Sequence, residues 1–146
     1  MKAVKFLSMF AVALVMSLSF SSCSKDDDEP TISSSISELK DTGTAFTYSY
    51  TSKVMLLSVS YEITYGYEVV DGVKKITSHK NVTTWPDAEM AQEDYNASVD
   101  DPMCDVTLSG NKVIYDYKSA EYEGMTEDDV RDEYEMEKSI IAAFNM

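Results

Sequence analysis

Hydrophobic and polar residues alternate along the chain after residue 44. Phe46, Tyr48 and Tyr50 are separated by Thr and Ser, and the same period of two runs from Met55 to Val69. Alternation of this length is typical of antiparallel strands that bury one face and leave the other in water. We therefore expect an N-terminal strand near 46–51 and a longer strand that ends at Val70.

Asp71-Gly72 follows this strand and is a strong signal for a two-residue hairpin turn. With the turn there, the predicted cross-strand pairs are Tyr67 with Ile76, Glu68 with Lys75, Tyr61 with Val82, and Ile63 with Lys80. The last pair sets an apolar residue against a lysine, a mismatch that a β-bulge would correct. The same register places His79 opposite Thr64 on the polar face, where we expect an exposed histidine.

A second hairpin is predicted with Gly110-Asn111 as its turn. This register pairs Leu108 with Val113, Val106 with Tyr115, and Cys104 with Tyr117. All six side chains then share one apolar face, which supports the register because a slip of one residue would reverse every side chain. Cys104 is accordingly expected to be a buried, unreactive thiol.

Two helices are predicted between and after these hairpins. Pro86 and Asp87 suit the start of a helix over 87–96, whose narrow apolar stripe is Ala88, Ala91 and Tyr95. Thr126 is the expected N-cap of the second helix. The apolar face of that helix is Val130, Tyr134, Ile140, Ile141 and Phe144, and its acids are assigned to the other face. The predicted class is α+β in the order β-ββ-α-ββ-α, an antiparallel sheet with both helices packed on one face.

The N-terminus reads as a secretory signal. Lys2 and Lys5 precede an apolar run over 6–20, and about 22 Å of helix falls short of the about 30 Å that a bilayer core requires. Phe20-Ser21-Ser22-Cys23 resembles the lipobox of bacterial lipoproteins, although Phe20 replaces the usual aliphatic residue. The resemblance implies cleavage after residue 22 and acyl chains on Cys23, which would hold the protein on the outer membrane.

An acidic segment comes directly after Cys23. The run Ser24, Lys25, Asp26, Asp27, Asp28 and Glu29 resembles the export signal of Bacteroidota surface lipoproteins, which implies display on the cell exterior. The alternative is a solvated spacer on a protein that stays on the periplasmic face. The stretch over 24–43 is poor in large apolar residues and is expected to be a flexible tether. The predicted organisation is a signal over 1–22, the lipidated tether over 23–43, and one domain over 44–146.

Charge and composition exclude several classes of protein. The 146 residues carry a formal charge of −14, so nucleic acid is excluded as a natural partner. One His and two Cys are too few for a zinc module or a disulfide scaffold. The sequence contains no phosphate-binding glycine loop and no Ser-His-Asp pattern. We expect no cofactor and no enzymatic activity.

A few residues remain as candidates for a site. Asp105 and Asp116 face each other in the second hairpin and could form an acid/base pair or a cation site. Asp100 and Asp101 in the preceding loop could bind calcium weakly, although the EF-hand spacing is absent. The simpler interpretation of these four is solvated surface. Trp85, Tyr65 and Tyr67 could form an aromatic surface for a sugar or peptide, and the simpler interpretation is core.

The first choice is a surface-anchored binding module with an unknown protein or glycan ligand. The alternatives are a periplasmic accessory or inhibitor lipoprotein and a small hydrolase using Asp105 and Asp116. The order of elements resembles small YehR-like and PepSY-like secreted modules, and no residue role is carried over from them.

Overall fold

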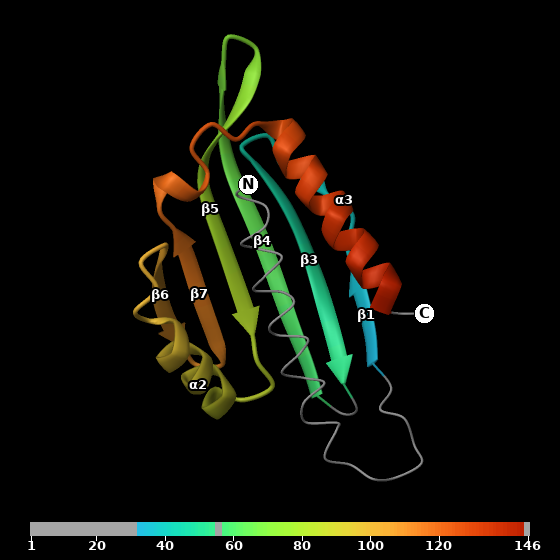
Figure 1. The fold of residues 1–146 in the computed structure, drawn as a ribbon, viewed down its shortest axis with the longest axis vertical. Coiled ribbons are helices and arrows are strands. Elements are labelled where there is room, and N and C mark those ends of the chain that lie inside the picture. The colour runs from blue at the N-terminus through green and yellow to red at the C-terminus, as the bar shows by residue number, and fades with distance from the viewer. Residues whose placement is uncertain (1–31, 55–56, 145–146) are drawn as a thin grey trace.

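The computed structural model describes residues 32–54 and 57–144 (Figure 1). The predicted signal over 1–22, Cys23 and the acidic run over 24–29 lie outside the described residues. The side chain of Phe144, assigned to the apolar face of the second helix, lies outside them as well.

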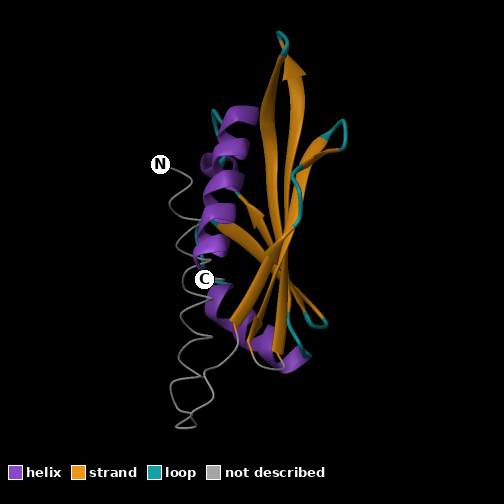
Figure 2. Cartoon of the chain, turned by 90° about the vertical axis from the view of Figure 1, so that its right-hand side faces the viewer, coloured by secondary structure: helices purple, strands orange, loops and turns teal. Residues whose placement is uncertain are grey.

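In the described part, seven strands form one antiparallel sheet in the order β1-β3-β4-β5-β7-β6, with β2 beside β3. Figure 2 shows both described helices on the same side of this sheet. The predicted α+β class and helix placement are therefore confirmed. The elements are β1 (Ile32–Ile36), β2 (Lys40–Asp41), β3 (Ala45–Val54), β4 (Leu57–Val70), β5 (Val73–Thr84), α2 (Ala88–Ser98), β6 (Cys104–Ser109), β7 (Lys112–Tyr117), the short 3-10 helix η1 (Ser119–Glu121) and α3 (Glu127–Phe144).

The two faces of the sheet differ sharply in composition. The face under the helices holds the alternating aromatic residues, with Phe46, Tyr48 and Tyr50 of β3 all buried. The opposite face has no described helix over it and carries small hydroxyl side chains, among them Thr51 and Ser60, whose oxygens lie 3.3 Å apart. The hydrophobic residues of the predicted alternating pattern therefore point to the helix-covered face, and the polar residues between them point to the open polar face.

The predicted tether is shorter than expected because the sheet begins at residue 32. β1 pairs along its whole length with β3, and the hydroxyl oxygens of Ser34 and Ser52 lie 3.1 Å apart. Tyr134 on α3 donates a hydrogen bond of 2.8 Å to the carbonyl of Ser37. The boundary at residue 44 was wrong, because an edge strand is held by backbone hydrogen bonds and needs few apolar side chains of its own.

The first hairpin turns at Asp71 and Gly72, which have φ of 53° and 78° as a type I′ turn requires. Close to the turn the predicted pairs Tyr67 with Ile76 and Glu68 with Lys75 are confirmed. A bulge between Gly66 and Tyr67 then shifts the register by one residue. A side chain at Gly66 would contact the hydroxyl of Ser78 and would require that serine side chain to move.

Beyond the bulge the predicted pairs are wrong. Tyr61 pairs with Thr83 and Ile63 with Asn81, so that Lys80 lies on the open polar face opposite Thr64. His79 pairs with Tyr65 and turns onto the helix-covered face, where it is 1% exposed. The expected exposed histidine is therefore a buried one.

The second hairpin forms as predicted. Leu108 pairs with Val113, Val106 with Tyr115, and Cys104 with Tyr117. Gly110 has φ of 62°, as the first central residue of the turn requires.

Both helices begin where the sequence indicates. Asp87 caps α2 by accepting a hydrogen bond of 2.9 Å from the Met90 amide. Thr126 precedes α3, and its amide donates to the Asp129 carboxyl at 2.8 Å. In α2 only Ala91 of the expected stripe is fully buried, because Ala88 faces solvent at the first turn. Within the described ranges, no helix has the length and apolarity to span a bilayer.

Candidate functional site

The predicted aromatic surface does not form, because its three members lie in different places. Tyr65 is 1% exposed in the core. Tyr67 stacks on Phe46 with ring centroids 4.8 Å apart. Trp85 packs against the cluster under α2, and its ring nitrogen donates to Asp94 at 2.8 Å. Tyr65 is therefore a core residue, while Tyr67 and Trp85 are partly buried and pack against the edge of the two core clusters.

Asp105 and Asp116 do face each other on neighbouring strands, as predicted. Both side chains are exposed, and Lys80 on β5 lies opposite Asp116 from the other side. All three point to the open polar face of the sheet, away from the helices. Over the described residues, no group of three or more His, Cys, Asp or Glu could hold a metal ion.

The loop acid Asp101 and the cysteine Cys104 have structural roles in the fold. Asp101 accepts a hydrogen bond of 2.8 Å from the Met103 amide and so closes the turn before β6, while Asp100 is exposed. Cys104 is 2% exposed, and burial raises the pKa of its thiol to about 12. A thiol with so high a pKa is a poor nucleophile at neutral pH.

Two glutamates that the sequence analysis assigned to the outer face of the second helix are buried. Glu133 and Glu137 lie one turn apart on α3, are 3% and 4% exposed, and face the tyrosines of the sheet. They share the buried side of α3 with Val130, Tyr134 and Ile141. Positions 130, 133, 134, 137 and 141 follow the i, i+3, i+4, i+7, i+11 spacing of a single helix face. That spacing was the available signal, and it was missed because glutamate is rarely fully buried.

The hydrogen bonds of this buried pair are incomplete. Tyr65 donates its hydroxyl hydrogen to Glu133 Oε2. Glu133 Oε1 and Glu137 Oε2 have no hydrogen-bond partner. The Tyr48 hydroxyl lies close enough to Glu137 to lower the pKa of that carboxyl by hydrogen bonding. Burying an oxygen atom without a hydrogen-bond donor costs free energy, so such atoms are rare in folded proteins. Their presence makes this cluster unusual.

Burial also changes the ionisation of both carboxyl groups. Burial raises the pKa of Glu133 to about 7, with the Tyr65 hydrogen bond opposing the shift. Burial raises the pKa of Glu137 to about 8, and the neighbouring charge of Glu133 adds to the effect. At neutral pH both carboxyl groups are therefore protonated in a large fraction of molecules, whereas ordinary surface glutamates are ionised.

His79 is the centre of an aromatic stack beside this pair. Its ring lies 4.2 Å from that of Tyr65 at 3° and 4.5 Å from that of Tyr117 at 13°. Burial lowers the pKa of His79 to about 3, so the imidazole is neutral at physiological pH. The stack runs across β4, β5 and β7 and makes a flat aromatic floor.

This floor lies between the two helices. Figure 1 shows α2 beside β6 and β7 at one end of the sheet and α3 over β3 and β1 at the other. α3 packs against residues of both central strands, because Ile63 of β4 and Ile76 of β5 belong to the same core cluster as Val130 of α3. Asn81 of β5 lies on the same face, and its buried Oδ1 also has no hydrogen-bond partner. We call this area the central face; it comprises Tyr48, Tyr61, Tyr65, His79, Asn81 and Tyr117, with Glu133 and Glu137 on α3.

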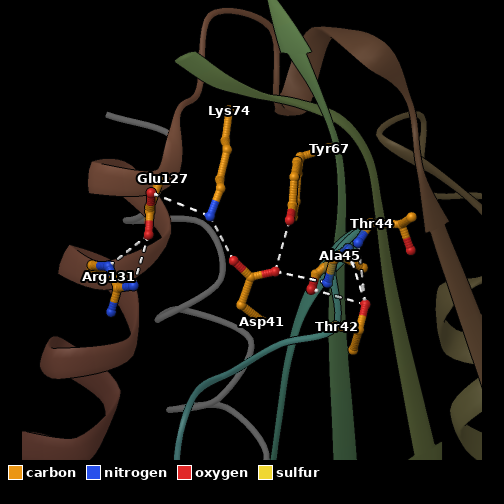
Figure 3. Close-up of polar contacts among 9 residues, drawn as sticks. Asp41, Thr42, Thr44, Ala45, Tyr67, Lys74, Glu127 and Arg131 are labelled. Atoms are coloured by element: carbon orange, nitrogen blue, oxygen red, sulfur yellow. Dashed lines mark hydrogen bonds and ion pairs between the residues drawn. The ribbon is translucent and has the colours of Figure 1, made fainter. Parts of the chain in front are cut away.

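A polar network at one end of α3 fixes the helix against the sheet (Figure 3). Asp41 of β2 accepts from Lys74 at 2.6 Å and from Tyr67 at 2.7 Å. These two hydrogen bonds hold the pKa of Asp41 at about 2. Lys74 reaches Glu127 at 3.9 Å, and Arg131 pairs with Glu127 at 2.7 Å. The network joins β2, β4, β5 and α3 and so helps to set where Glu133 and Glu137 lie.

A separate open depression of about 540 Å³ lies near the start of α3. It is lined by residues that include Lys75, Ile76, Tyr122 and Met125, and none of the predicted site residues contributes to it. Comparison with family models, curated proteins and solved structures finds no match for this chain. The candidate site therefore rests on its geometry, and the central face is the area with the most unusual chemistry.

Proposed function

We propose that this protein is a lipid-anchored cell-envelope protein that acts as a non-enzymatic binding module on the exterior of the outer membrane. The lipobox-like sequence ending at Cys23 supports attachment through acyl chains. The acidic run over 24–29 supports display on the outside. The unknown ligand is a protein or a glycan, and nucleic acid is disfavoured by the charge of −14.

The observation that carries a binding role is the central face. Buried acceptor oxygens without donors lie beside stacked aromatic rings, and a ligand that displaced part of this packing would supply the missing donors. Binding sites commonly combine apolar or aromatic walls with a few polar groups that fix orientation. A hydrolase has less support, because its candidate acid pair, Asp105 and Asp116, lies on the open face of the sheet, opposite the central face.

The start of the sheet also limits how far the domain can lie from its anchor. The chain from Cys23 to Ile32 spans at most about 30 Å when fully extended. A module held this close to the bilayer is suited to ligands that are themselves near the cell surface.

Location is tested by adding a non-permeant protease or biotinylation reagent to intact cells. We expect the domain to be cleaved or labelled without lysis. Protection until the outer membrane is opened would leave the periplasmic accessory protein as the better proposal.

Binding is tested by probing the acylated protein in nanodiscs against arrays of glycans and of peptides. We expect a signal that Tyr61→Ala on the central face removes and that Thr47→Ala on the open face leaves intact. A signal lost with Thr47→Ala and retained with Tyr61→Ala would move the site to the open face.

A further inference from the structure

The open depression near the start of α3 lies at the base of the first hairpin. One wall is the hairpin itself, with Glu68 on β4 and Lys75 on β5. The other wall is the connection from η1 to α3, which Figure 1 shows beside β5 below the projecting end of the hairpin. Its volume of about 540 Å³ falls within the range of about 300–1,000 Å³ that small-molecule sites occupy.

Backbone hydrogen bonds hold the two walls against each other. The Ile76 amide donates to the Met125 carbonyl at 3.0 Å, and Lys75 forms an antiparallel backbone bridge with Thr126. Within the second wall, the Met125 amide donates to the Tyr122 carbonyl at 3.0 Å. The depression is therefore formed before any ligand arrives, which lowers the entropy that binding costs.

The β-bulge of the first hairpin contributes to this wall. Thr77 is the extra residue on β5, between Ile76, which pairs with Tyr67, and Ser78, which pairs with Gly66. Thr77 is exposed and lines the depression. Bulges often lie next to functional sites because they redirect a side chain out of the regular pleat. The bulge therefore adds a hydroxyl-bearing residue to the lining.

The lining combines apolar and polar residues. Ile76 and Met125 are buried, and the half-buried Tyr122 packs against the same core cluster. Ser119 and Thr77 add hydroxyl groups on the exposed side. Small-molecule sites commonly combine an apolar or aromatic wall with a few polar groups. A sugar ring fits such a lining, because it has an apolar C–H face and a polar edge.

The depression also carries charges of both signs. Glu68 and Lys75 face each other across the hairpin and are exposed, and Glu123 lies on the second wall. Over the described ranges, the ion pairs engage Lys74 and Arg131, and none engages Glu68 or Lys75. A cation would meet the lysine, and an anion would meet the carboxylates. A hydroxyl group suits both, because it donates to a carboxylate and accepts from an ammonium group in charge-assisted hydrogen bonds.

We infer that this depression is a binding site for a neutral saccharide, with Glu68 and Lys75 bridged by adjacent hydroxyl groups and the C–H face of the sugar against Tyr122 and Met125. The inference goes beyond the proposed function, because the site is separate from the central face and does not depend on it. A charged sugar is disfavoured, because the lining offers a like charge to either sign.

The position of the depression keeps it accessible on an anchored protein. Ile32, where the described sheet begins, pairs with Val54 at one end of β3. The other end of β3 pairs at Ala45 with Gly66, next to the hairpin that forms the depression. The site therefore lies at the end of the sheet opposite the entry of the tether, where a bilayer at the anchor would leave it open.

The probes are the methyl glycosides of glucose, galactose, mannose and N-acetylglucosamine. Each is titrated into the acylated protein in nanodiscs and followed by saturation-transfer NMR. The matched probe is the fully O-methylated form of each glycoside, which keeps the ring and has no hydroxyl donor. We expect saturable binding of at least one glycoside and at least tenfold weaker binding of its O-methylated form.

The matched variants are Glu68→Ala and Lys75→Met, which change exposed residues of the hairpin. Their controls are Glu62→Ala and Lys80→Met, exposed residues of the same two strands that do not line the depression. We expect the first two variants to weaken binding at least tenfold and the controls to leave it unchanged. Because all four residues are exposed, the thermal midpoints should stay close to that of the wild type.

Three results would overturn the inference. The first is that no glycoside binds, and the second is that a glycoside and its O-methylated form bind equally. The third is binding that Glu68→Ala and Lys75→Met retain; if Tyr61→Ala removes that binding, the sugar belongs to the central face and the proposed function stands. Acetyl-trialanine methylamide is a further probe, and its binding in place of every glycoside would make the depression a peptide site.

Discussion

A buried hydrogen bond joins Tyr65 on β4 to Glu133 on α3, residues that are 68 positions apart in the chain. It is the polar link between the aromatic floor of the sheet and the acidic side of the helix. The Tyr65 ring also stacks on His79, so one tyrosine contacts both the acid and the imidazole. The link explains why α3 can hold a carboxyl against a tyrosine-rich face, because one of its oxygens is satisfied there.

The first prediction is that the free energy of unfolding falls as the pH rises from 5 to 9. Folding raises the pKa of Glu133 to about 7 and that of Glu137 to about 8. At any pH between the unfolded pKa and these folded values, the native state therefore binds more protons than the unfolded state. Stability from this source is complete below the unfolded pKa and is lost as pH rises through the folded values. Urea unfolding at pH 5, 7 and 9 should show a loss on the order of 1–3 kcal/mol.

The control for this effect is the pair of variants Glu133→Gln and Glu137→Gln, which cannot ionise. Each should flatten the pH dependence, whereas Glu135→Gln should follow the wild type. A stability that rises from pH 5 to 9 in the wild type would contradict the burial of this pair.

The second prediction concerns the turn of the second hairpin. Gly110 has φ of 62°, a conformation that a β-branched residue adopts only under strain. Gly110→Val should lower the free energy of unfolding by about 1–3 kcal/mol. Gly110→Asn is the control, because asparagine tolerates this region, and it should lose much less. Thermal midpoints equal to wild type for both variants would argue against the turn.

The third prediction is that Cys23→Ser releases the protein from membranes. Two or three acyl chains hold a protein stably at a bilayer, and the serine variant has no thiol to receive them. Membrane fractionation after labelling with a radioactive fatty acid measures both the anchor and the location. A serine variant that is still labelled would refute lipidation at Cys23.

The fourth prediction is that neutral replacements at Lys25, Asp26, Asp27, Asp28 and Glu29 keep the protein inside the outer membrane. The sheet begins at Ile32, so these changes should leave the thermal midpoint within error of wild type. Labelling of intact cells compares the two forms. Undiminished surface labelling would leave the spacer interpretation of this segment.

Local chemistry was enough to predict strands β3 to β7, both turns and both helix starts, whereas β1 and β2 were taken for a tether. Asp71-Gly72 and Gly110-Asn111 demand particular backbone angles that other residues rarely adopt, and alternation decides which side chains share a face. Asp87 indicated the first helix start because its carboxyl accepts from the Met90 amide, and at the second start the Thr126 amide donates to the Asp129 carboxyl. The lipobox resemblance at Cys23 likewise depends on a short contiguous motif.

The candidate site was decided by contacts between distant parts of the chain. The register shift between Gly66 and Tyr67 is a property of how β4 and β5 pair, and it carries His79 to the buried face. Glu133 and Glu137 are buried because α3 docks on a sheet whose tyrosines accommodate them, and glutamate in a helix pattern otherwise indicates solvent. Burial is a property of the assembled layers, so the chemistry that depends on burial appears only in the tertiary structure.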